Sequence, residues 1–445
     1  DWSDPNIVYA GEYLGILTRY DHRTRQVHVA GAWPDNPSGW AGEQMKYRFQ
    51  WTAPIATSPH DAKVVYHAAQ VLFRSTDGGR TWAVISPDLS RNDKSKQQWT
   101  GGPITGDNTG VETYGTVFAI AESPKQAGLI WAGSDDGLVH VTRDAGKTWT
   151  NLTAAIKGLP EWGTVSMIEP SPFDAATAYV VIDAHRLDDM TPYLFKTSDY
   201  GKTWVRLDGP LPRDVYLHAV REDPQQRGTL YLGTERGVMM SRNDGAAWEP
   251  LQLNLPAVPV HDLVVKDHSL VVGTHGRSIW ILDDLTPVRE MSPAVSAAAL
   301  HVFPVADTVS WRYASTPRRP GNGQNPPRGA VIHYWLKDKT EGEVVIEISD
   351  AKGALVRRLS SIVPPATGVD DDPETDKKRK PALTTAAGVN RAVWDLRWTG
   401  ATVIRNAKID MGDPDPGPLA LPGTYTVKVT AGGASASTTL VVTQD

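Results

Sequence analysis

The chain has 445 residues, with 45 Lys and Arg against 51 Asp and Glu for a net charge of −6, and 40% of its residues are hydrophobic. It is too apolar to be disordered, and an acidic balance without a basic stripe argues against a nucleic acid partner. No apolar run approaches the roughly 18 residues that a transmembrane helix needs, and the absence of Cys excludes disulfides, thiolate metal sites and Cys nucleophiles.

The sequence begins at Asp1, with neither an initiator Met nor a signal peptide. We therefore expect that a leader has been removed or that the chain starts inside a longer gene product. The 39 Gly and 33 Pro indicate many turns, and 16 Trp against 6 Phe indicate that Trp has a specific structural use.

Short apolar runs separated by turns form six similar units between residues 1 and 290. Residues 7–15, 130–139, 230–239 and 270–277 share one frame, an apolar strand that ends in Gly before a second strand. Each unit contains about four short strands, and such units at this spacing predict the blades of a β-propeller. The predicted fold class is all-β, with six to seven four-stranded blades over residues 1–290.

The first unit is predicted to be incomplete, because only residues 1–5 precede what should be its second strand. An unpaired sheet edge is normally avoided in proteins. We expect the missing strand to come from residues 295–311 folding back, or from a preceding part of the same protein.

An eight-residue pattern ending in Trp occurs at residues 75–82, 142–149, 197–204 and, less completely, 241–248. The shared form is S/T-x-D/N-x-G-x-x-W; we call each copy an octad. The Asp or Asn accepts hydrogen bonds that close a turn, Gly supplies a positive φ, and Trp packs between neighbouring repeats. The residues given these structural roles are Asp77, Trp82, Asp144, Trp149, Asp199, Trp204, Asn243 and Trp248.

The C-terminal third is predicted to be a separate β domain. Residues 291–330 read as a closing segment and linker, and residues 331–445 as an Ig-like β-sandwich with a charged insert at 363–386. The insert is interpreted as a solvated hairpin, with calcium or partner binding left open. Asp410, Asp413 and Asp415 form a second acidic loop whose spacing fits no known cation-binding motif.

Propeller geometry directs the search for a site to one rim. Successive strands are antiparallel, so the octads, which lie between the third and fourth strands, are on one rim. The turns between the second and third strands and the connectors between blades share the opposite rim. The longest connectors, residues 33–51 and 86–115, fall there, and long loops on a rigid frame often carry binding sites.

Carboxylates and exposed Trp on that rim suit sugars, whose hydroxyls bond to acids and whose C–H faces stack on indole. Expected ligand-binding residues are Glu12, Trp40, Trp99, Asp107, Asp183, His185, His275 and Arg277. Candidate catalytic carboxyl groups are those of Asp135, Asp136, Glu235 and Glu112. Alternatively, these acids serve as turn formers, or the connectors dock another propeller.

The octad resembles the Asp-box, or BNR repeat, of sialidases, sortilin-type receptors and two-propeller xyloglucan hydrolases. The resemblance covers residues 1 to about 290 and is specific for fold. Residues 101–112 and 273–284 also resemble the C-terminal half of bacterial two-propeller BNR-repeat proteins labelled sortilin-like or glycosyl hydrolase. That resemblance implies a bacterial, extracytoplasmic protein in which another propeller precedes this one.

Two functions are weighed. The favoured one is a binding or scaffold protein within a larger assembly or precursor, with a polysaccharide, a peptide or protein ligand, an upstream propeller or another subunit as partner. The alternative is a glycoside hydrolase, which needs two carboxyl groups roughly 5–5.5 Å apart for retention or 6.5–9.5 Å for inversion. In the xyloglucan hydrolases the two acids come from different propellers. We expect no cofactor and no metal, because no nucleotide loop, His-rich metal motif or nucleophile elbow is present.

Overall fold

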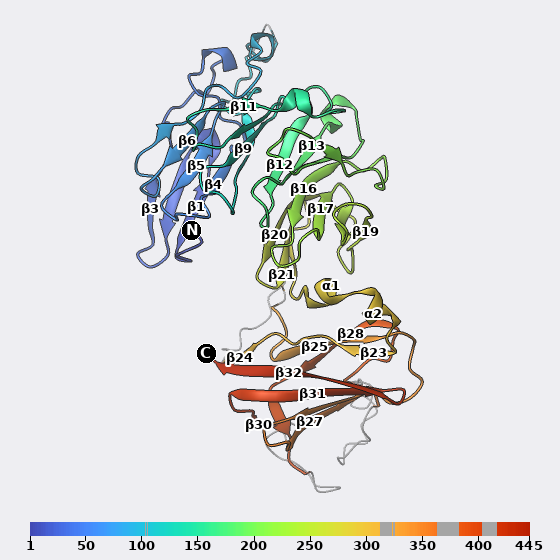
Figure 1. The fold of residues 1–445 in the computed structure, drawn as a ribbon. Helices are drawn as coiled ribbons and strands as arrows, with labels where there is room; N and C mark the ends of the chain where they lie inside the picture. The colour runs from blue at the N-terminus through green and yellow to red at the C-terminus, as the bar shows by residue number, and fades with distance from the viewer. Residues whose placement is uncertain (103, 105, 312–322, 324, 363–381, 403–415) are drawn as a thin grey trace. The chain divides into compact units, whose positions relative to one another are not determined.

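The computed structural model describes residues 1–102, 104, 106–311, 323, 325–362, 382–402 and 416–445 (Figure 1). The chain divides into two compact units, Asp1–Leu282 and Asp283–Asp445. Nearly every regular element is a β-strand in an antiparallel sheet, so the all-β prediction is confirmed. None of the helices within these ranges has the length and apolar character that crossing a membrane requires.

The first unit is a succession of antiparallel sheets, which we call blades 1 to 6 in chain order (Figure 1). Blade 1 holds β1 (Ile7–Gly11), β2 (Leu17–Asp21) and β3 (Gln26–Val29). Blade 2 holds β4 (Ile55–Thr57), β5 (Val65–Ala68), β6 (Leu72–Ser75) and β7 (Ala83–Val84). Blade 3 holds β8 (Val117–Glu122), β9 (Ile130–Ser134), β10 (Val139–Thr142) and β11 (Thr150–Asn151).

Blades 4 to 6 continue the same order. Blade 4 holds β12 (Thr164–Pro170), β13 (Ala178–Asp183), β14 (Tyr193–Thr197) and β15 (Val205–Arg206). Blade 5 holds β16 (Leu217–Glu222), β17 (Leu230–Thr234), β18 (Gly237–Ser241) and β19 (Glu249–Pro250). Blade 6 holds β20 (Val260–Lys266), β21 (Ser269–Thr274) and β22 (Ile279–Leu282). Four-stranded propeller blades are thereby confirmed for blades 2 to 5, and the two terminal blades have three strands within the described residues.

Apolar side chains on both faces of the inner blades hold the unit together. Trp131 of blade 3 is fully buried in a cluster with Val165 and Val180 of blade 4. Tyr179 of blade 4 packs in the same way with Leu217 of blade 5. Burying one such side chain stabilises a fold by about 1.5–3 kcal/mol, so neighbouring blades are joined mainly by hydrophobic contact.

The octads close the turns between the third and fourth strands. In the first copy, the Asp77 carboxylate accepts hydrogen bonds from the N–H groups of Arg80 and Thr81, both at 2.9 Å, and from the Thr81 hydroxyl at 2.7 Å. These bonds hold the pKa of Asp77 below its ordinary value. Gly79, with φ of 88°, makes the turn that a side chain would oppose.

The octad Trp residues tie each blade to the one before it. The indole N–H of Trp82 donates to the Ala30 carbonyl at 2.8 Å, and that of Trp149 donates to the Ile85 carbonyl at 2.8 Å. Trp248 repeats the contact across blades 4 and 5, whereas Trp204 bonds within its own turn. The described octads therefore combine a local turn lock with a bond between blades in three of the four copies.

Glycines in the second strands allow neighbouring blades to approach closely. A Cβ at Gly133 would lie 2.2 Å from the Val165 side chain, and a Cβ at Gly233 would lie 2.4 Å from the Val260 carbonyl oxygen. Gly273 in terminal blade 6 is less crowded, since the nearest atom to a Cβ there is 3.5 Å away. The strand–Gly frame seen in the sequence thus marks the contact between blades.

The inner strands of blades 3 to 6 share a β-bulge at one position. The register skips one residue in each strand, and the skipped residues are Phe118, Ser166, His218 and His261. A bulge bends the strand and re-aims the extra side chain. The bulge residues therefore occupy equivalent places near the start of each inner strand.

The second unit is a small β-sandwich-like body with its own core. Its five-stranded sheet has the order β24 (Thr308–Ser310), β32 (Ala434–Gln444), β31 (Gly423–Ala431), β26 (Val345–Ser349) and β27 (Leu355–Ser360). A three-stranded sheet has β23 (Leu300–Val302), β25 (Ala330–Leu336) and β28 (Gly388–Trp394), and β29 (Arg397–Thr399) pairs with β30 (Pro416–Leu419). The helices are α1 (Thr286–Glu290) and α2 (Pro293–Ala297).

The closing segment expected at residues 295–311 takes part in this second unit. β23 pairs with β25, and β24 pairs in parallel with β32. The described pairing thus uses these residues within the sandwich, where Tyr334 and Trp394 are fully buried in the core. Most of the charged insert at 363–386, and the loop with Asp410, Asp413 and Asp415, lie outside the described residues. The Ig-like topology stays a prediction.

Candidate functional site

Three predicted rim residues occupy equivalent positions in their blades. The backbone N–H of Asp135 donates to the Thr116 carbonyl at 2.9 Å, and that of Glu235 donates to the Tyr216 carbonyl at 3.2 Å. His275 makes the same bond to the residue before β20, at 2.9 Å. Each therefore follows the second strand of its blade and is held against the start of the inner strand.

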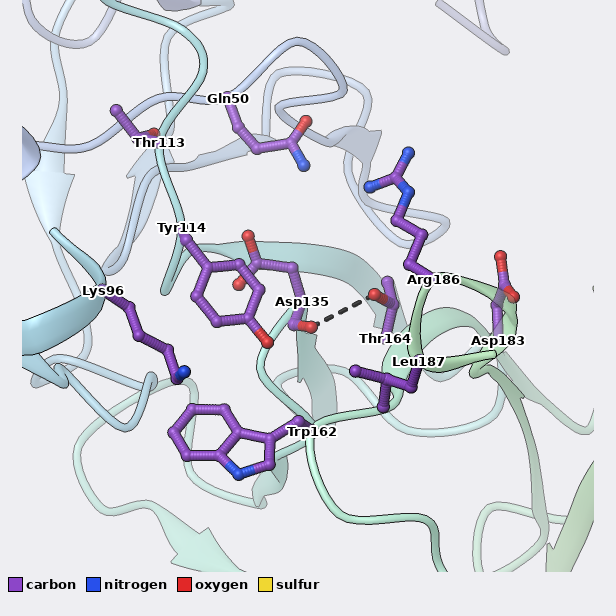
Figure 2. Close-up of a pocket in the computed structure, with 10 residues that line it drawn as sticks. All are labelled: Gln50, Lys96, Thr113, Tyr114, Asp135, Trp162, Thr164, Asp183, Arg186 and Leu187. Carbon is purple, nitrogen blue, oxygen red and sulfur yellow. Dashed lines mark hydrogen bonds between the residues drawn. The ribbon is translucent and has the colours of Figure 1, made fainter. Parts of the chain in front are cut away.

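A cavity of about 370 Å³ opens beside the first of these positions (Figure 2). It is bounded by the connectors around blades 2 to 4 and by the turn after β13. The lining residues are Gln50, Lys96, Thr113, Tyr114, Asp135, Trp162, Thr164, Asp183, Arg186 and Leu187. Asp135 and Asp183 were predicted from the sequence, whereas the aromatic and basic residues were not.

Tyr114 and Trp162 form the aromatic part of the cavity. Their rings stack with centroids 6.3 Å apart and an interplanar angle of 27°. The Lys96 ammonium lies 4.9 Å from the Trp162 ring centroid, and the Arg91 guanidinium lies 4.3 Å from it. Each aromatic residue stands directly before a Gly-Thr-Val run that opens an inner strand, at 115–117 and 163–165. That repeated signal could have identified both residues from the sequence.

Asp135 is almost fully buried, with 4% of its surface exposed. Its carboxyl group accepts hydrogen bonds from the N–H groups of Gly115 at 3.0 Å and Thr116 at 2.8 Å, and from the Thr116 hydroxyl at 2.9 Å. Burial raises the pKa of Asp135 to about 7, and the charge of Asp136 adds to the increase. The group thus supports the entry to β8 and also lines the cavity.

Asp136 holds the connector at residues 86–115 against blade 3. Its carboxyl group accepts bonds from the Ser134 hydroxyl at 2.5 Å and from the Arg91 N–H at 2.8 Å, and it is 1% exposed. Burial raises the pKa of Asp136 as well. Both adjacent carboxyl groups are therefore engaged in bonds that order the rim.

Arg48 joins the two long connectors. Its buried guanidinium donates to the Gly115 carbonyl at 2.9 and 3.2 Å, to Asp88 at 3.1 Å and to the Ser90 hydroxyl at 3.1 Å. The connectors at 33–51 and 86–115 are thus fixed to each other next to the cavity. This residue was not predicted from the sequence.

A second, smaller cavity of about 50 Å³ adjoins the first. It is lined by Trp40 and Glu112, both predicted from the sequence, and by amide and hydroxyl side chains of the same connectors. Lys96, Thr113 and Tyr114 line both cavities. The two cavities therefore adjoin each other with Tyr114 between them, and we call them together the groove.

A row of rings begins at the wall of the larger cavity and crosses blades 4 to 6. His185 Nδ1 lies 2.7 Å from an Asp183 carboxylate oxygen, and the His185 ring stacks on Tyr216 at 4.6 Å. The row continues through contacts between successive centroids of Tyr216–His218 at 5.1 Å, His218–His261 at 4.2 Å and His261–His275 at 4.8 Å.

Charged neighbours surround this row. His218 Nε2 lies 3.1 Å from a Glu235 carboxylate oxygen. Burial lowers the pKa of His261, and the nearby rings of His218 and His275 lower it further, while Glu235 and Asp183 oppose them. Within the described residues, no group of three His, Asp or Glu side chains is arranged to hold a metal ion.

Four further predicted ligand residues do not line either cavity. Trp99 is 54% exposed on its connector, and Glu12, Asp107 and Arg277 are exposed as well. None of these residues is among those that line the two cavities described. Their predicted role in ligand binding stays a prediction.

The blades, the turns and the rim cavity define a β-propeller with a groove on one rim. No family model matches the chain. A segment of 111 residues is 34% identical to a vacuolar protein sorting/targeting protein 10 of Laccaria bicolor, covering 24% of this chain and 6% of that protein. A segment of 132 residues is 28% identical to an oligoxyloglucan-reducing end-specific xyloglucanase of Emericella nidulans, covering 29% of this chain and 16% of that protein.

Among solved structures, the chain is similar to the GH74 xyloglucanase from Xanthomonas campestris. The two are 16% identical with a TM-score of 0.46, and the match covers 98% of this chain and 71% of that one. An agreement at this level carries no argument about function. The matched segments also span only a small part of the two curated relatives.

Proposed function

We propose that the first unit binds a polysaccharide chain along the groove formed by the two adjoining cavities. The observation that carries this proposal is the shared wall of Tyr114, which stacks on Trp162 and faces both cavities. Flat aromatic rings offer contact area to the C–H faces of sugars, and the surrounding amide, hydroxyl and carboxyl groups suit sugar hydroxyls. The larger cavity, of about 370 Å³, has room for a sugar unit, and the smaller one adds polar groups beside it.

Binding is favoured over hydrolysis because three of the four candidate catalytic carboxyl groups have structural partners. Asp135 and Asp136 are buried and accept bonds from backbone groups. Glu235 is paired with His218, and Glu112 lies in the smaller cavity. A hydrolase needs one proton donor and a second carboxylate free to act on the sugar or on water.

One observation favours the alternative, a glycoside hydrolase. Asp135 lines the larger cavity, and its pKa of about 7 suits a general acid at neutral pH. In this alternative the second carboxylate comes from Glu112 or Glu235, or from another propeller. Release of reducing sugar from a polysaccharide, lost in Asp135→Asn, would decide for it.

We propose that the protein works outside the cytoplasm of a bacterium, as part of a larger assembly or precursor. The absence of Cys fits an exported protein, and three-stranded terminal blades suit a body that packs against another propeller or subunit. Copurification of one specific protein with the intact chain, lost when the first unit is deleted, would test this.

The binding proposal is tested with a glycan array, a peptide panel and a hydrolase screen on the 445-residue chain. Trp162→Ala and Tyr114→Ala should each weaken glycan binding by roughly tenfold or more, as expected for a central aromatic contact. Trp2→Ala, a 59% exposed Trp of the N-terminal segment, is the matched control. Peptide binding without glycan binding, or equal effects of all three variants, would contradict the proposal.

A further inference from the structure

Two basic side chains reach the larger cavity from different elements (Figure 2). Lys96 belongs to the connector between blades 2 and 3, and Arg186 belongs to the turn that follows β13 in blade 4. Both are exposed at the cavity wall, and neither has an ion-pair partner among the described residues. In Figure 2 they stand on opposite sides of Asp135 and Tyr114.

The acids that line the same cavity form no ion pair with these cations among the described residues. Asp183 is paired with His185 at 2.7 Å. Asp135 is directed to the backbone of Gly115 and Thr116, and burial raises its pKa to about 7, so it is largely uncharged in mildly acidic solution. Lys96 therefore offers a positive charge beside Trp162 that no carboxylate of the described cavity lining pairs with.

The aromatic surface lies next to one of these cations. The Lys96 ammonium is 4.9 Å from the centroid of Trp162, whose ring stacks on Tyr114. A ligand in contact with this ring places its substituents within reach of Lys96. A compact residue with a flat apolar face and a carboxylate at its edge meets both features at once.

We infer that the larger cavity binds an acidic polysaccharide, with the carboxylate of one uronate residue held by Lys96, the sugar ring of that residue against Trp162, and Arg186 on the opposite side facing another carboxylate of the chain. This inference rests on the proposed binding of a polysaccharide and adds the chemical class of the ligand. Charge-assisted hydrogen bonds to a carboxylate are about twice as strong as neutral ones. In an acidic peptide the carboxylates are carried on flexible chains and no ring accompanies them, so the peptide makes less use of Trp162.

The test uses oligomers of galacturonate, of glucuronate and of mannuronate with guluronate, each beside its carboxyl-reduced neutral counterpart. Affinity is measured by isothermal titration calorimetry at low and high salt. At least one acidic oligomer should bind roughly tenfold or more tightly than its reduced form, and the advantage should shrink as salt screens the charges.

Two uncharged variants locate the effect. Lys96→Met and Arg186→Gln should each weaken binding of the acidic oligomer by roughly tenfold, and should weaken binding of the reduced oligomer by a clearly smaller factor. Lys147→Met, an exposed Lys of an octad turn, is the matched control for lost charge. Both variants alter exposed side chains, and an unchanged thermal unfolding curve verifies that they fold.

The outcomes separate the two proposals. Equal affinity for acidic and reduced oligomers overturns the uronate inference and leaves polysaccharide binding standing. Absence of binding to every oligosaccharide, acidic or neutral, overturns both the uronate inference and the proposed binding of a polysaccharide. Preferential binding of poly-glutamate over all acidic oligosaccharides also overturns the inference, because it assigns the cations to a peptide ligand.

Discussion

Replacement of Asp135 by Ala and by Asn separates its structural role from its charge. Asp135→Ala leaves two buried N–H groups and one hydroxyl without their acceptor. Each unsatisfied buried group costs about 1–3 kcal/mol, so we expect the free energy of unfolding to fall by about 3–5 kcal/mol. Asp135→Asn keeps an acceptor oxygen for the N–H groups and should cost about 1 kcal/mol or less in acid.

The free energy of unfolding of Asp135→Asn should therefore rise relative to that of the parent protein as the pH rises. The pKa of Asp135 is about 7 in the fold against 3.8 for an unperturbed group. Because the pKa of Asp135 is higher in the folded than in the unfolded protein, the carboxyl group favours folding at low pH. This contribution to stability is lost as the pH rises through the pKa of the folded protein. Between pH 5 and pH 8 the parent should lose about 2.5 kcal/mol that the Asn variant keeps.

Urea unfolding followed by Trp fluorescence at pH 5 and pH 8 measures these differences. Asp107→Asn, which removes an exposed carboxylate from the connector at residues 86–115, controls for the change in net charge. The reasoning is refuted if the difference between Asp135→Asn and the parent is independent of pH, because the carboxyl group would then not be desolvated in the fold.

Three further changes test the packing between blades, the ion pair of Arg48, and the burial of His140, which lies in β10 with 8% of its surface exposed. Gly133→Ala should lower the free energy of unfolding by about 1–3 kcal/mol through overpacking, while Gly273→Ala should change it by no more than about 0.5 kcal/mol; equal costs in urea unfolding would contradict the close approach of blades. Arg48→Met should cost about 3–5 kcal/mol because it leaves a partly buried carboxylate unpaired, against less than about 0.5 kcal/mol for exposed Arg236→Met; calorimetric melting compares them. Burial lowers the pKa of His140 to about 4. The free energy of unfolding of the parent should therefore fall by about 3 kcal/mol as the pH falls from 6.5 to 4, and that of His140→Gln should not. Parallel curves of stability against pH would show that His140 is not buried in its neutral form.

Much of the first unit could be predicted from the sequence because its repeats carry local chemistry. The Asp of each octad bonds to residues a few positions later, and the Gly takes a positive φ, so adjacent residues alone determine the turn. The strand–Gly frame identified the blades for the same reason. The rim assignment of Asp135, Asp183 and His185 followed from antiparallel strand order.

Contacts between distant segments could not be predicted in this way. Lys96 comes from the connector between blades 2 and 3 and Arg186 from a turn within blade 4, and only the folded unit places them at one cavity. The row from His185 to His275 likewise depends on contacts between three blades. The use of residues 300–310 as strands of the second unit was missed, because short apolar runs do not indicate which sheet they join.

The bulge shared by blades 3 to 6 has a consequence for how such a molecule can change. The bulge residue has no partner in the strand register, so its identity is uncoupled from the ladder on either side. The same backbone bulge already carries side chains of very different size and polarity, namely Phe118, Ser166, His218 and His261. Substitution at these four sites would change the side chains near the start of each inner strand, blade by blade, while the hydrophobic contacts between blades stay intact.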